Sequence, residues 1–236
     1  MTNNIFTNDF EYTLPEHLIA QIPIEPRDHS RLMHLDRSLH KLTHHNFYDI
    51  GSLLREGDLL IVNNSRVIPA RLLGNRAETG GTVEVLLLHR EDGTRWRSLM
   101  KPGRRLRKGS ILQIGDSRIE ILEKHEDGTS IINMQDESLI HKAGLIPLPP
   151  YIKESLNDQE RYQTVYSKKQ GSAAAPTAGL HFTDNLLESL QQNGIKIAEV
   201  TLHIGLDTFR PVSVQSPKDH EIHSEYFELD ASTSNE

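Results

Sequence analysis

The stretch Ser110–Met134, SILQIGDSRIEILEKHEDGTSIINM, decides the predicted fold because it contains three short strands in quick succession. The segments Ser110–Ile114, Arg118–Leu122 and Ser130–Met134 are short and rich in apolar residues, as expected of strands. The breaks between them contain Gly115-Asp116 and Asp127-Gly128, which are typical turn residues. This pattern predicts consecutive antiparallel strands.

The same pattern extends over the region from Val67 to about Leu145. Further strands are predicted at Val67–Leu73, Val83–His89 and Trp96–Lys101, again with glycine in the turns between them. No helical pattern interrupts the strands. Short strands at regular intervals predict a small antiparallel barrel or sandwich.

Both flanking regions combine helices with strands. Helices are predicted after Pro15, at Asn46–Leu54, at Asp158–Tyr166 and from Thr183 to Gly194, and strands at Ser30–Leu35, Leu39–Thr43, Asp58–Val62 and Ile195–Ile204. The predicted fold class is therefore α+β and multidomain. Residues 1–66 and 147–236 form a mixed α/β main domain, and residues 67–146 form an inserted antiparallel β domain.

Composition narrows the functional classes. The chain has 236 residues, 36% of them apolar and 25% charged, with no apolar run long enough to span a membrane and no secretory signal pattern. It contains no cysteine, which excludes disulfides, thiolate catalysis and cysteine-based zinc sites. These features predict a soluble cytoplasmic protein without a membrane partner.

Charge is distributed unevenly along the chain. The net charge is −7, but the segment from Ser216 to Glu236 has six acids and one base, so the preceding residues carry only −2. Five bases gather in Lys101-Pro102-Gly103-Arg104-Arg105-Leu106-Arg107-Lys108, on a predicted β-turn. We interpret this cluster either as a solvated loop or as a contact with a nucleic-acid phosphate backbone. Trp96 nearby could stack on a base, although a core position is the commoner one.

A second unusual stretch is Gly171–Phe182, GSAAAPTAGLHF. Its small side chains allow another surface to approach the backbone, and Pro176 disfavours a helix through the alanines. A helix begins directly afterwards, near Thr183. The stretch is interpreted as a binding loop at a helix N-terminus, with a tightly packed turn as the alternative.

Several ionisable residues are candidates for chemistry. His181, His203 and His223 could each act as a general base near neutral pH, and Arg210 could hold a carboxylate. Taken singly, each such residue is more often structural. No phosphate-binding loop and no dinucleotide-binding fingerprint is present, and His40, His44 and His45 lack the carboxylate spacing of a metal site, so no metal is expected.

Motifs spread over nearly the whole chain resemble those of the S-adenosylmethionine:tRNA ribosyltransferase-isomerase family. They are Tyr12-Thr13-Leu14-Pro15, Ser30-Arg31-Leu32-Met33, Gly57-Asp58-Leu59-Leu60, Arg66-Val67-Ile68-Pro69-Ala70-Arg71, Pro147-Leu148-Pro149-Pro150-Tyr151-Ile152, Glu160-Arg161-Tyr162-Gln163-Thr164-Val165-Tyr166, the Gly171–Phe182 stretch, Thr201-Leu202-His203-Ile204-Gly205-Leu206 and His223-Ser224-Glu225-Tyr226.

The resemblance implies an enzyme of queuosine biosynthesis whose α/β domain carries an inserted β-barrel. Its co-substrate is S-adenosylmethionine, used as a ribosyl donor, and its acceptor is 7-aminomethyl-7-deazaguanine at the wobble position of tRNA. Epoxyqueuosine is formed in the tRNA, and adenine and methionine are released. A monomer without prosthetic group or metal is expected.

The resemblance also implies roles for particular residues. His181 or His203 would be the base, and Arg210 would hold the methionine carboxylate. Residues lining S-adenosylmethionine would be Ala175, Pro176, Thr177, Ala178, Gly179, Phe182 and Gly205. The tRNA would lie along Lys101, Arg104, Arg105, Arg107 and Lys108.

Members of this family continue beyond the point where this sequence stops, so the resemblance implies a chain shortened at its C-terminus. Two other functions are weighed on that basis. One is an inactive fragment that retains only tRNA binding, and the other is a conventional methyltransferase, which the missing glycine-rich cofactor loop disfavours.

Overall fold

A computed structural model describes residues 5–205, 212–220 and 224–235. These residues form two compact units. The main unit comprises Met1–Asn64, Pro149–Ser167 and Pro176–Glu236, and the barrel unit comprises Ser65–Leu148 and Lys168–Ala175. Most of the barrel unit is therefore one continuous segment, flanked along the chain by parts of the main unit.

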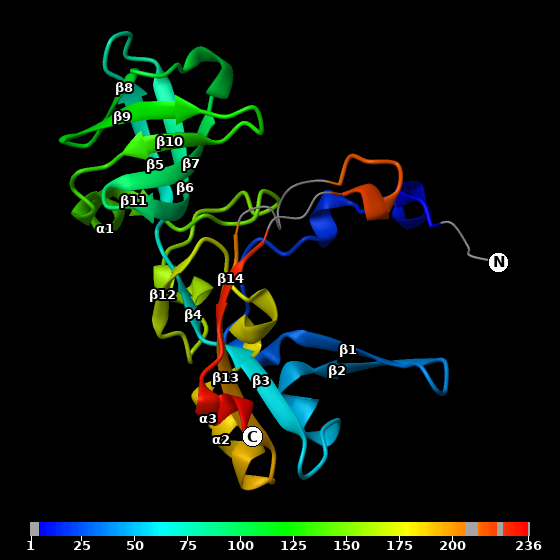
Figure 1. Ribbon diagram of the computed structural model, residues 1–236. Helices are drawn as coiled ribbons and strands as arrows, with labels where there is room; N and C mark the ends of the chain where they lie inside the picture. The colour runs from blue at the N-terminus through cyan, green and yellow to red at the C-terminus, as the bar shows by residue number, and fades with distance from the viewer. Residues whose placement is uncertain (1–4, 206–211, 221–223, 236) are drawn as a thin grey trace. The chain divides into compact units, whose positions relative to one another are not determined.

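The barrel unit is built on a closed six-stranded antiparallel sheet (Figure 1). The strands follow the order β5-β6-β7-β10-β9-β8, and β8 pairs with β5 to close the ring. Their bounds are Arg71–Arg76 for β5, Thr82–Asp92 for β6, Arg95–Lys101 for β7, Ile111–Ile114 for β8, Ser117–Lys124 for β9 and Ser130–Asn133 for β10. The prediction of an antiparallel barrel within an α+β fold is confirmed, and the closure excludes the sandwich.

Alternating side chains fill the barrel interior. Val83, Val85 and Leu87 of β6 are all buried, as are Leu112 and Ile114 of β8, whereas the residues between them are more exposed. Successive side chains on a strand point to opposite faces, so this period of two places one complete row inside. Ile119 and Ile121 of β9 and Ile132 of β10 are buried in the same core. The alternation of side chains along these strands thus fills the core.

Two parts of the barrel unit differ from the predictions. The strand expected at Val67–Leu73 is split into β4 (Ser65–Val67) and β5. Pro69 lies between the two strands and, lacking an N–H group, cannot donate to a sheet.

The barrel unit also contains elements beyond the predicted strands. β4 pairs in parallel with β12 (Lys169–Ser172), which adds residues 168–175 to a unit expected to end at residue 146. A helix, α1 (Ser138–Ala143), and a short strand, β11 (Gly144–Leu145), follow β10 and were not predicted.

The main unit contains a projecting hairpin and a small sheet. The hairpin pairs β1 (Arg31–Asp36) with β2 (Lys41–Asn46) in antiparallel register, as predicted. A 3₁₀ helix, η4 (Phe47–Ser52), follows where a short helix was expected, and the Asn46 N–H donates to Asp49 Oδ2 at 3.0 Å. The sheet has the order β14-β13-β3, in which β3 (Leu59–Asn63) and β13 (Lys196–His203) are parallel and β14 (Tyr226–Glu228) is antiparallel to β13.

Helix α2 (Asp184–Gln192) has the limits that its sequence predicted. The Thr183 side chain accepts from the Leu186 N–H at 3.1 Å, which caps the first turn. Leu186 and Leu190 pack with Phe47, Phe182 and Ile195 in a core separate from that of the barrel. Gly194 ends the helix at a φ of +80°, a conformation that favours glycine.

Two predicted helices are only single turns. The helix expected after Pro15 is reduced to η2 (Glu16–Leu18), and the one expected at Asp158–Tyr166 is reduced to η6 (Gln159–Tyr162). Leu18 and Ile22 are 65% and 76% exposed. Short helices depend on the packing of an apolar face, and these apolar side chains are not packed among the described residues. Further short helices within the described ranges are η1 (Thr7–Phe10), η3 (Arg27–His29), η5 (Gly103–Arg105), η7 (Thr177–His181), η9 (Pro217–Asp219) and α3 (Ala231–Ser234).

Candidate functional site

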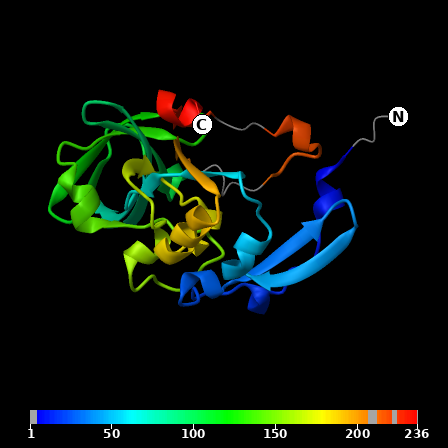
Figure 2. The ribbon, with the colours of Figure 1, turned by 90° about the horizontal axis from the view of Figure 1, so that it is seen from below.

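The stretch Gly171–Phe182 is divided between the two units. Residues up to Ala175 belong to the barrel unit, where Ala173, Ala174 and Ala175 are buried after the end of β12. Residues from Pro176 onward belong to the main unit and form η7 (Figure 2). Thr177 and Ala178 are exposed, whereas Gly179 and Phe182 are buried.

Gly179 is required by a close contact. A Cβ atom at this position would lie 2.1 Å from the hydroxyl of Tyr166, so a larger residue would force the Tyr166 side chain to move. Burial raises the pKa of Tyr166 to about 12, and its hydroxyl therefore stays protonated. The Gly179 N–H donates to the Pro176 carbonyl at 2.8 Å. The sequence predicts that the amides from Ala175 to Gly179 face a ligand, but the Gly179 amide is used within the turn.

His181 is held by residues from distant parts of the chain. Its Nδ1 lies 2.9 Å from the hydroxyl of Ser30, and its ring lies 5.1 Å from that of Phe47. Burial lowers the pKa of His181 most, and the positive charge of Arg161 lowers it further. A hydrogen bond to the Arg27 backbone opposes this shift, and the charge of Arg27 adds the smallest lowering. The imidazole is therefore neutral at pH 7 and able to accept a proton.

Two arginines accompany His181 in the main unit. Arg27 Nη1 donates to the Gln163 carbonyl at 2.8 Å, and Arg161 Nη2 donates to the Ile24 carbonyl at 3.0 Å while its Nε pairs with Glu25. Burial and the charge of Arg161 lower the pKa of Arg27, yet a guanidinium remains charged at neutral pH. Sequence reasoning gave no site role to Arg27 or Ser30, although Ser30 begins one of the motifs that carry the resemblance.

His203 lies at the carboxyl ends of the parallel strands β3 and β13. Its ring stacks on that of Tyr226, with centroids 5.8 Å apart and planes 14° from parallel. Asn64, which follows β3, accepts from the Thr201 hydroxyl at 2.8 Å and donates to Glu199 at 3.0 Å. Ligands of α/β sheets commonly bind beyond the carboxyl ends of parallel strands. Asn64 and Thr201 were missed, although both are buried polar residues at this edge.

Gly205 follows the same strand end. Its N–H donates to Glu225 Oε1 at 2.8 Å, so this predicted ligand-lining residue already has a carboxylate partner. Among the contacts that the structure describes, His181 and His203, the two candidate bases, share no partner residue. Arg210 and His223, which were predicted to act on substrate, lie outside the described residues.

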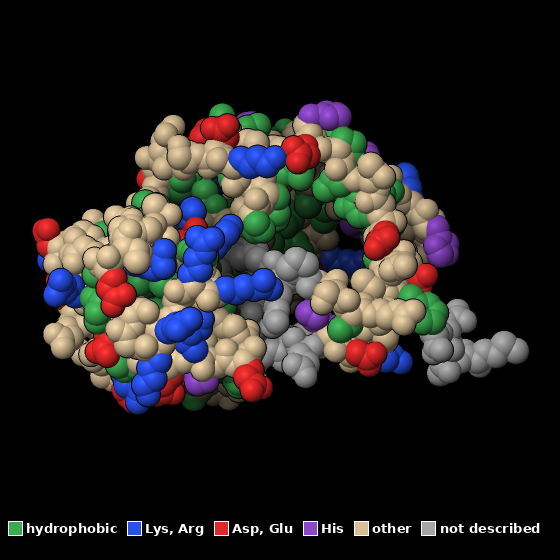
Figure 3. Space-filling view, turned by 90° about the horizontal axis from the view of Figure 1, so that it is seen from above, with side chains coloured by type: hydrophobic (Ala, Val, Ile, Leu, Met, Phe, Trp, Pro, Cys, Tyr) green, Lys and Arg blue, Asp and Glu red, His purple; other side chains and the backbone are tan. Residues whose placement is uncertain are grey.

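The basic cluster Lys101–Lys108 lies between β7 and β8 of the barrel unit. Lys101, Arg104, Arg105, Arg107 and Lys108 are all exposed, and within the described parts of the chain none of them forms an ion pair. Leu106 is 1% exposed and anchors the turn in the core. Lys124 Nζ donates to the carbonyls of Gly103 at 2.6 Å and Leu106 at 3.0 Å. Figure 3 shows Lys and Arg side chains gathered on this unit.

Trp96 is a core residue. It is 7% exposed, its Nε1 donates to Glu137 Oε1 at 3.2 Å, and the Arg90 guanidinium lies 5.6 Å from its ring centre. The interpretation of Trp96 as a core residue is confirmed, and its ring is not presented for stacking on a base.

Neither a metal cluster nor a membrane span is found where the structure describes the chain. No three His, Cys, Asp or Glu side chains among residues 5–205, 212–220 and 224–235 are grouped so as to hold a metal ion. None of the helices in these ranges has the length and apolar character needed to cross a bilayer.

Comparison with known proteins gives a consistent result. The profile of a family described as "Queuosine biosynthesis protein" matches residues 7–236. Proteins named S-adenosylmethionine:tRNA ribosyltransferase-isomerase from Staphylococcus epidermidis and Staphylococcus saprophyticus are each 50% identical to the chain, over 231 and 232 residues. These alignments cover 95% and 96% of the chain, and 68% of each relative.

A solved structure is also similar in sequence. The S-adenosylmethionine tRNA ribosyltransferase from Thermotoga maritima is 34% identical, and the match covers 96% of this chain with a TM-score of 0.40. The chain spans 63% of that protein's length.

Proposed function

The chain belongs to the queuosine biosynthesis protein family, and we propose that it acts as an S-adenosylmethionine:tRNA ribosyltransferase-isomerase. The reaction transfers and isomerises the ribosyl group of S-adenosylmethionine onto 7-aminomethyl-7-deazaguanine at the tRNA wobble position. Epoxyqueuosine is formed, and adenine and methionine are released. The observation that carries the proposal is the 50% identity, over nearly the whole chain, to relatives bearing this name.

The chemistry needs a base and a way to stabilise departing adenine. The sulfonium of S-adenosylmethionine acidifies the attached 5′-carbon, so a proton must leave from that carbon or from the attacking amine. Adenine must be protonated or hydrogen-bonded as its bond to ribose breaks. In our proposal His181 is the base, with His203 as the alternative.

Three features of the site support His181 in this role. Its pKa is lowered by burial and by two arginines, so the free imidazole predominates at neutral pH. The Ser30 hydroxyl engages Nδ1, which leaves Nε2 as the atom directed to substrate in our proposal. The ring packs on Phe47, which restricts its rotation.

The binding residues follow from the same proposal. S-adenosylmethionine would lie against the Pro176–Phe182 segment with Ala175 and Gly205, and Arg210 would hold the methionine carboxylate. The tRNA would contact the exposed Lys101–Lys108 cluster. We also propose a cytoplasmic monomer, since the substrate is tRNA. Sedimentation at increasing protein concentration tests the monomer, and cell fractionation tests the location.

Adenine release is the direct test of function. The protein is incubated with S-adenosylmethionine labelled in its adenine and with tRNA containing 7-aminomethyl-7-deazaguanine. We expect labelled free adenine to appear in proportion to modified tRNA. Formation of S-adenosylhomocysteine would instead indicate a methyltransferase, and tRNA binding without turnover would indicate a fragment that only binds tRNA.

The rate of adenine release is expected to depend on pH through His181. The base must be unprotonated, and its pKa lies below the ordinary value of about 6.5. The rate should therefore be constant near neutral pH and fall only once the pH drops below this lowered pKa. The measurement is single-turnover adenine release from pH 5 to 8, with tRNA affinity measured at each pH as the control. A rate that rises as the pH falls would contradict a histidine base.

A further inference from the structure

The β1–β2 hairpin has an unusual charge for this chain. Its sixteen residues, 31–46, carry a formal charge of +2, whereas the whole chain carries −7. The basic side chains are Arg31, Arg37 and Lys41, accompanied by the histidines His34, His40, His44 and His45. The hairpin therefore carries a local excess of positive charge on a protein whose net charge is negative.

The single acid of the hairpin, Asp36, is committed to the turn. Its Oδ1 accepts from the Ser38 N–H at 2.9 Å, the Ser38 hydroxyl at 2.6 Å and the Leu39 N–H at 3.0 Å. These hydrogen bonds lower the pKa of Asp36, the Ser38 hydroxyl contributing most. Within the described residues Asp36 pairs with none of the three cations, and Arg31, Arg37 and Lys41 are exposed and form no ion pair there.

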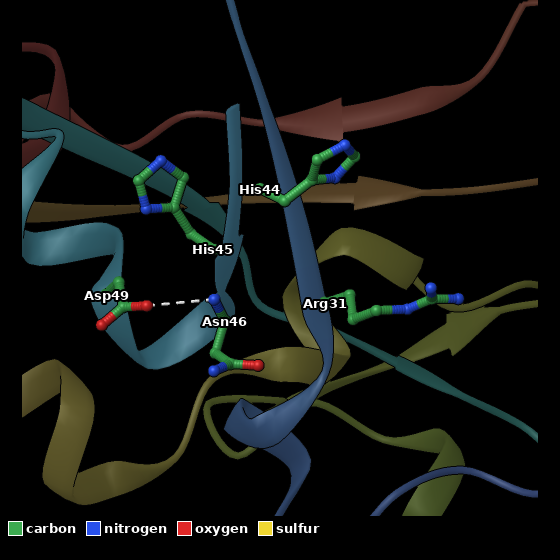
Figure 4. A pocket seen from close by; sticks show the side chains of 5 residues that line it. All are labelled: Arg31, His44, His45, Asn46 and Asp49. Atoms are coloured by element: carbon green, nitrogen blue, oxygen red, sulfur yellow. Dashed lines mark hydrogen bonds between the residues drawn. The ribbon is translucent and has the colours of Figure 1, made fainter. Parts of the chain in front are cut away.

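The two faces of the hairpin differ. One face packs inward: Leu32 contacts the main-unit core, and the Thr43 hydroxyl lies 3.4 Å from His34 Nδ1 and 3.0 Å from His45 Nε2. On the other face Arg31, Met33 and His44 are exposed, together with Leu35 and Leu42. Figure 4 shows the Arg31 and His44 side chains on one side of the hairpin and His45 on the other.

The hairpin projects from the rest of the main unit. Both ribbon views show the hairpin extending from η4 to a free turn, which carries Arg37 and His40 (Figures 1 and 2). Two-stranded β-ribbons are among the elements that proteins place against nucleic acid. Exposed cations without acidic partners supply the charge complementary to a phosphate backbone.

We propose that the exposed face and turn of the β1–β2 hairpin bind the phosphate backbone of RNA. Arg31 on the exposed face and Arg37 in the turn supply charges, and Lys41 adds a third at the turn end of β2, where it lies opposite Asp36 on the other face. The aliphatic side chains of the exposed face contact ribose and base surfaces. This contact rests on the proposed function, since its RNA is the tRNA substrate. It is a second RNA contact, separate in sequence from Lys101–Lys108. An anionic membrane is the other partner whose charge and apolar surface would suit this face.

The test compares two triple variants of the full chain. In R31Q/R37Q/K41Q the hairpin loses three charges, and in the control R55Q/K196Q/K218Q the main unit loses three exposed charges elsewhere. Binding of a tRNA transcript is measured between 50 and 200 mM KCl. We expect the hairpin variant to bind at least about tenfold more weakly. Its salt slope should fall by about three, because each phosphate that a cation neutralises contributes roughly one to the slope. The control should retain the wild-type slope.

Several outcomes would overturn the proposal. The first is a hairpin variant with the wild-type affinity and slope. The second is an equal change in both variants, which would reflect net charge alone. The third is a hairpin variant that no longer binds vesicles of anionic phospholipid but binds tRNA as the wild type does. We expect the hairpin variant and the wild type to have equal urea unfolding midpoints, because the three substituted side chains are exposed. Equal midpoints would exclude misfolding as the cause of weaker binding. The wild-type protein could also bind tRNA through the hairpin yet release no adenine. That result would reject the proposed function but would still support the contact between the hairpin and RNA.

Discussion

Replacing His181 with alanine is expected to lower the rate of adenine release by about 10²–10⁴-fold, the usual contribution of a general base. The affinity for tRNA should be unchanged, because His181 lies in η7 of the main unit and carries no charge at neutral pH. The measurement is single-turnover release of labelled adenine at saturating S-adenosylmethionine. The tRNA affinity is measured in parallel, and a urea unfolding midpoint equal to that of the wild type confirms that the variant is folded.

Two further variants make this result specific. His17→Ala removes an exposed imidazole from the same unit and should leave turnover at the wild-type level. His203→Ala distinguishes the two proposed bases. Full turnover in His181→Ala together with its loss in His203→Ala would transfer the role to His203. In the His181→Ala variant, any residual release should also lose the decline at acidic pH, because the group that titrates is absent.

Neutralising three arginines of the barrel unit, in R104Q/R105Q/R107Q, is expected to weaken tRNA binding by about 10²-fold or more near 0.1 M salt. The slope of log affinity against log salt should fall by about three, since each phosphate contact contributes roughly one. The three side chains are exposed, while Leu106 and Lys124 hold the turn that carries them. Adenine release should recover when tRNA is supplied at concentrations above the weakened dissociation constant.

A matched control keeps the change in net charge constant. The variant R55Q/R118Q/K142Q removes three exposed charges from other places. Arg118 is in the same barrel, but it lies near the opposite end of β9 from Lys124, roughly 20 Å away at the rise of a strand. The control should bind tRNA with nearly wild-type affinity. Wild-type binding that is insensitive to salt would refute a phosphate contact by this cluster.

The elements that could be predicted from the sequence are those whose stability comes from nearby residues. The barrel strands follow from short apolar segments at regular intervals and glycine turns, and α2 follows from its Thr183 cap, apolar stripe and Gly194 stop. The predicted helix after Pro15 was wrong: only Glu16–Leu18 form a helical turn, and among the described residues its apolar side chains Leu18 and Ile22 are exposed instead of packed. The parallel pairing of β12 with β4 was missed because it joins residues about a hundred positions apart, for which no local pattern exists.

The candidate site divides in the same way. His181 and the small residues before it could be selected from the sequence by their composition. The features that would make His181 a base come from elsewhere: Ser30 is 151 positions away, and Phe47, Arg27 and Arg161 belong to other segments. The exposure of the hairpin cations is equally a tertiary property, since the sequence of Arg31 does not show which face of β1 is covered.

The sequence by itself therefore determined the fold class, the strands of the barrel, the limits of α2, the basic cluster and the family. The strands and α2 depend on periodicity and turn chemistry, which involve residues only a few positions apart. The family depends on the order of motifs, which can be read directly from the sequence. Only the tertiary structure decided which side chains surround His181, which amides of the Gly171–Phe182 stretch are already bonded and which cations stay without partners. Burial and charge act through space, and they lower the pKa of His181 only after folding has removed its water and brought two arginines beside it.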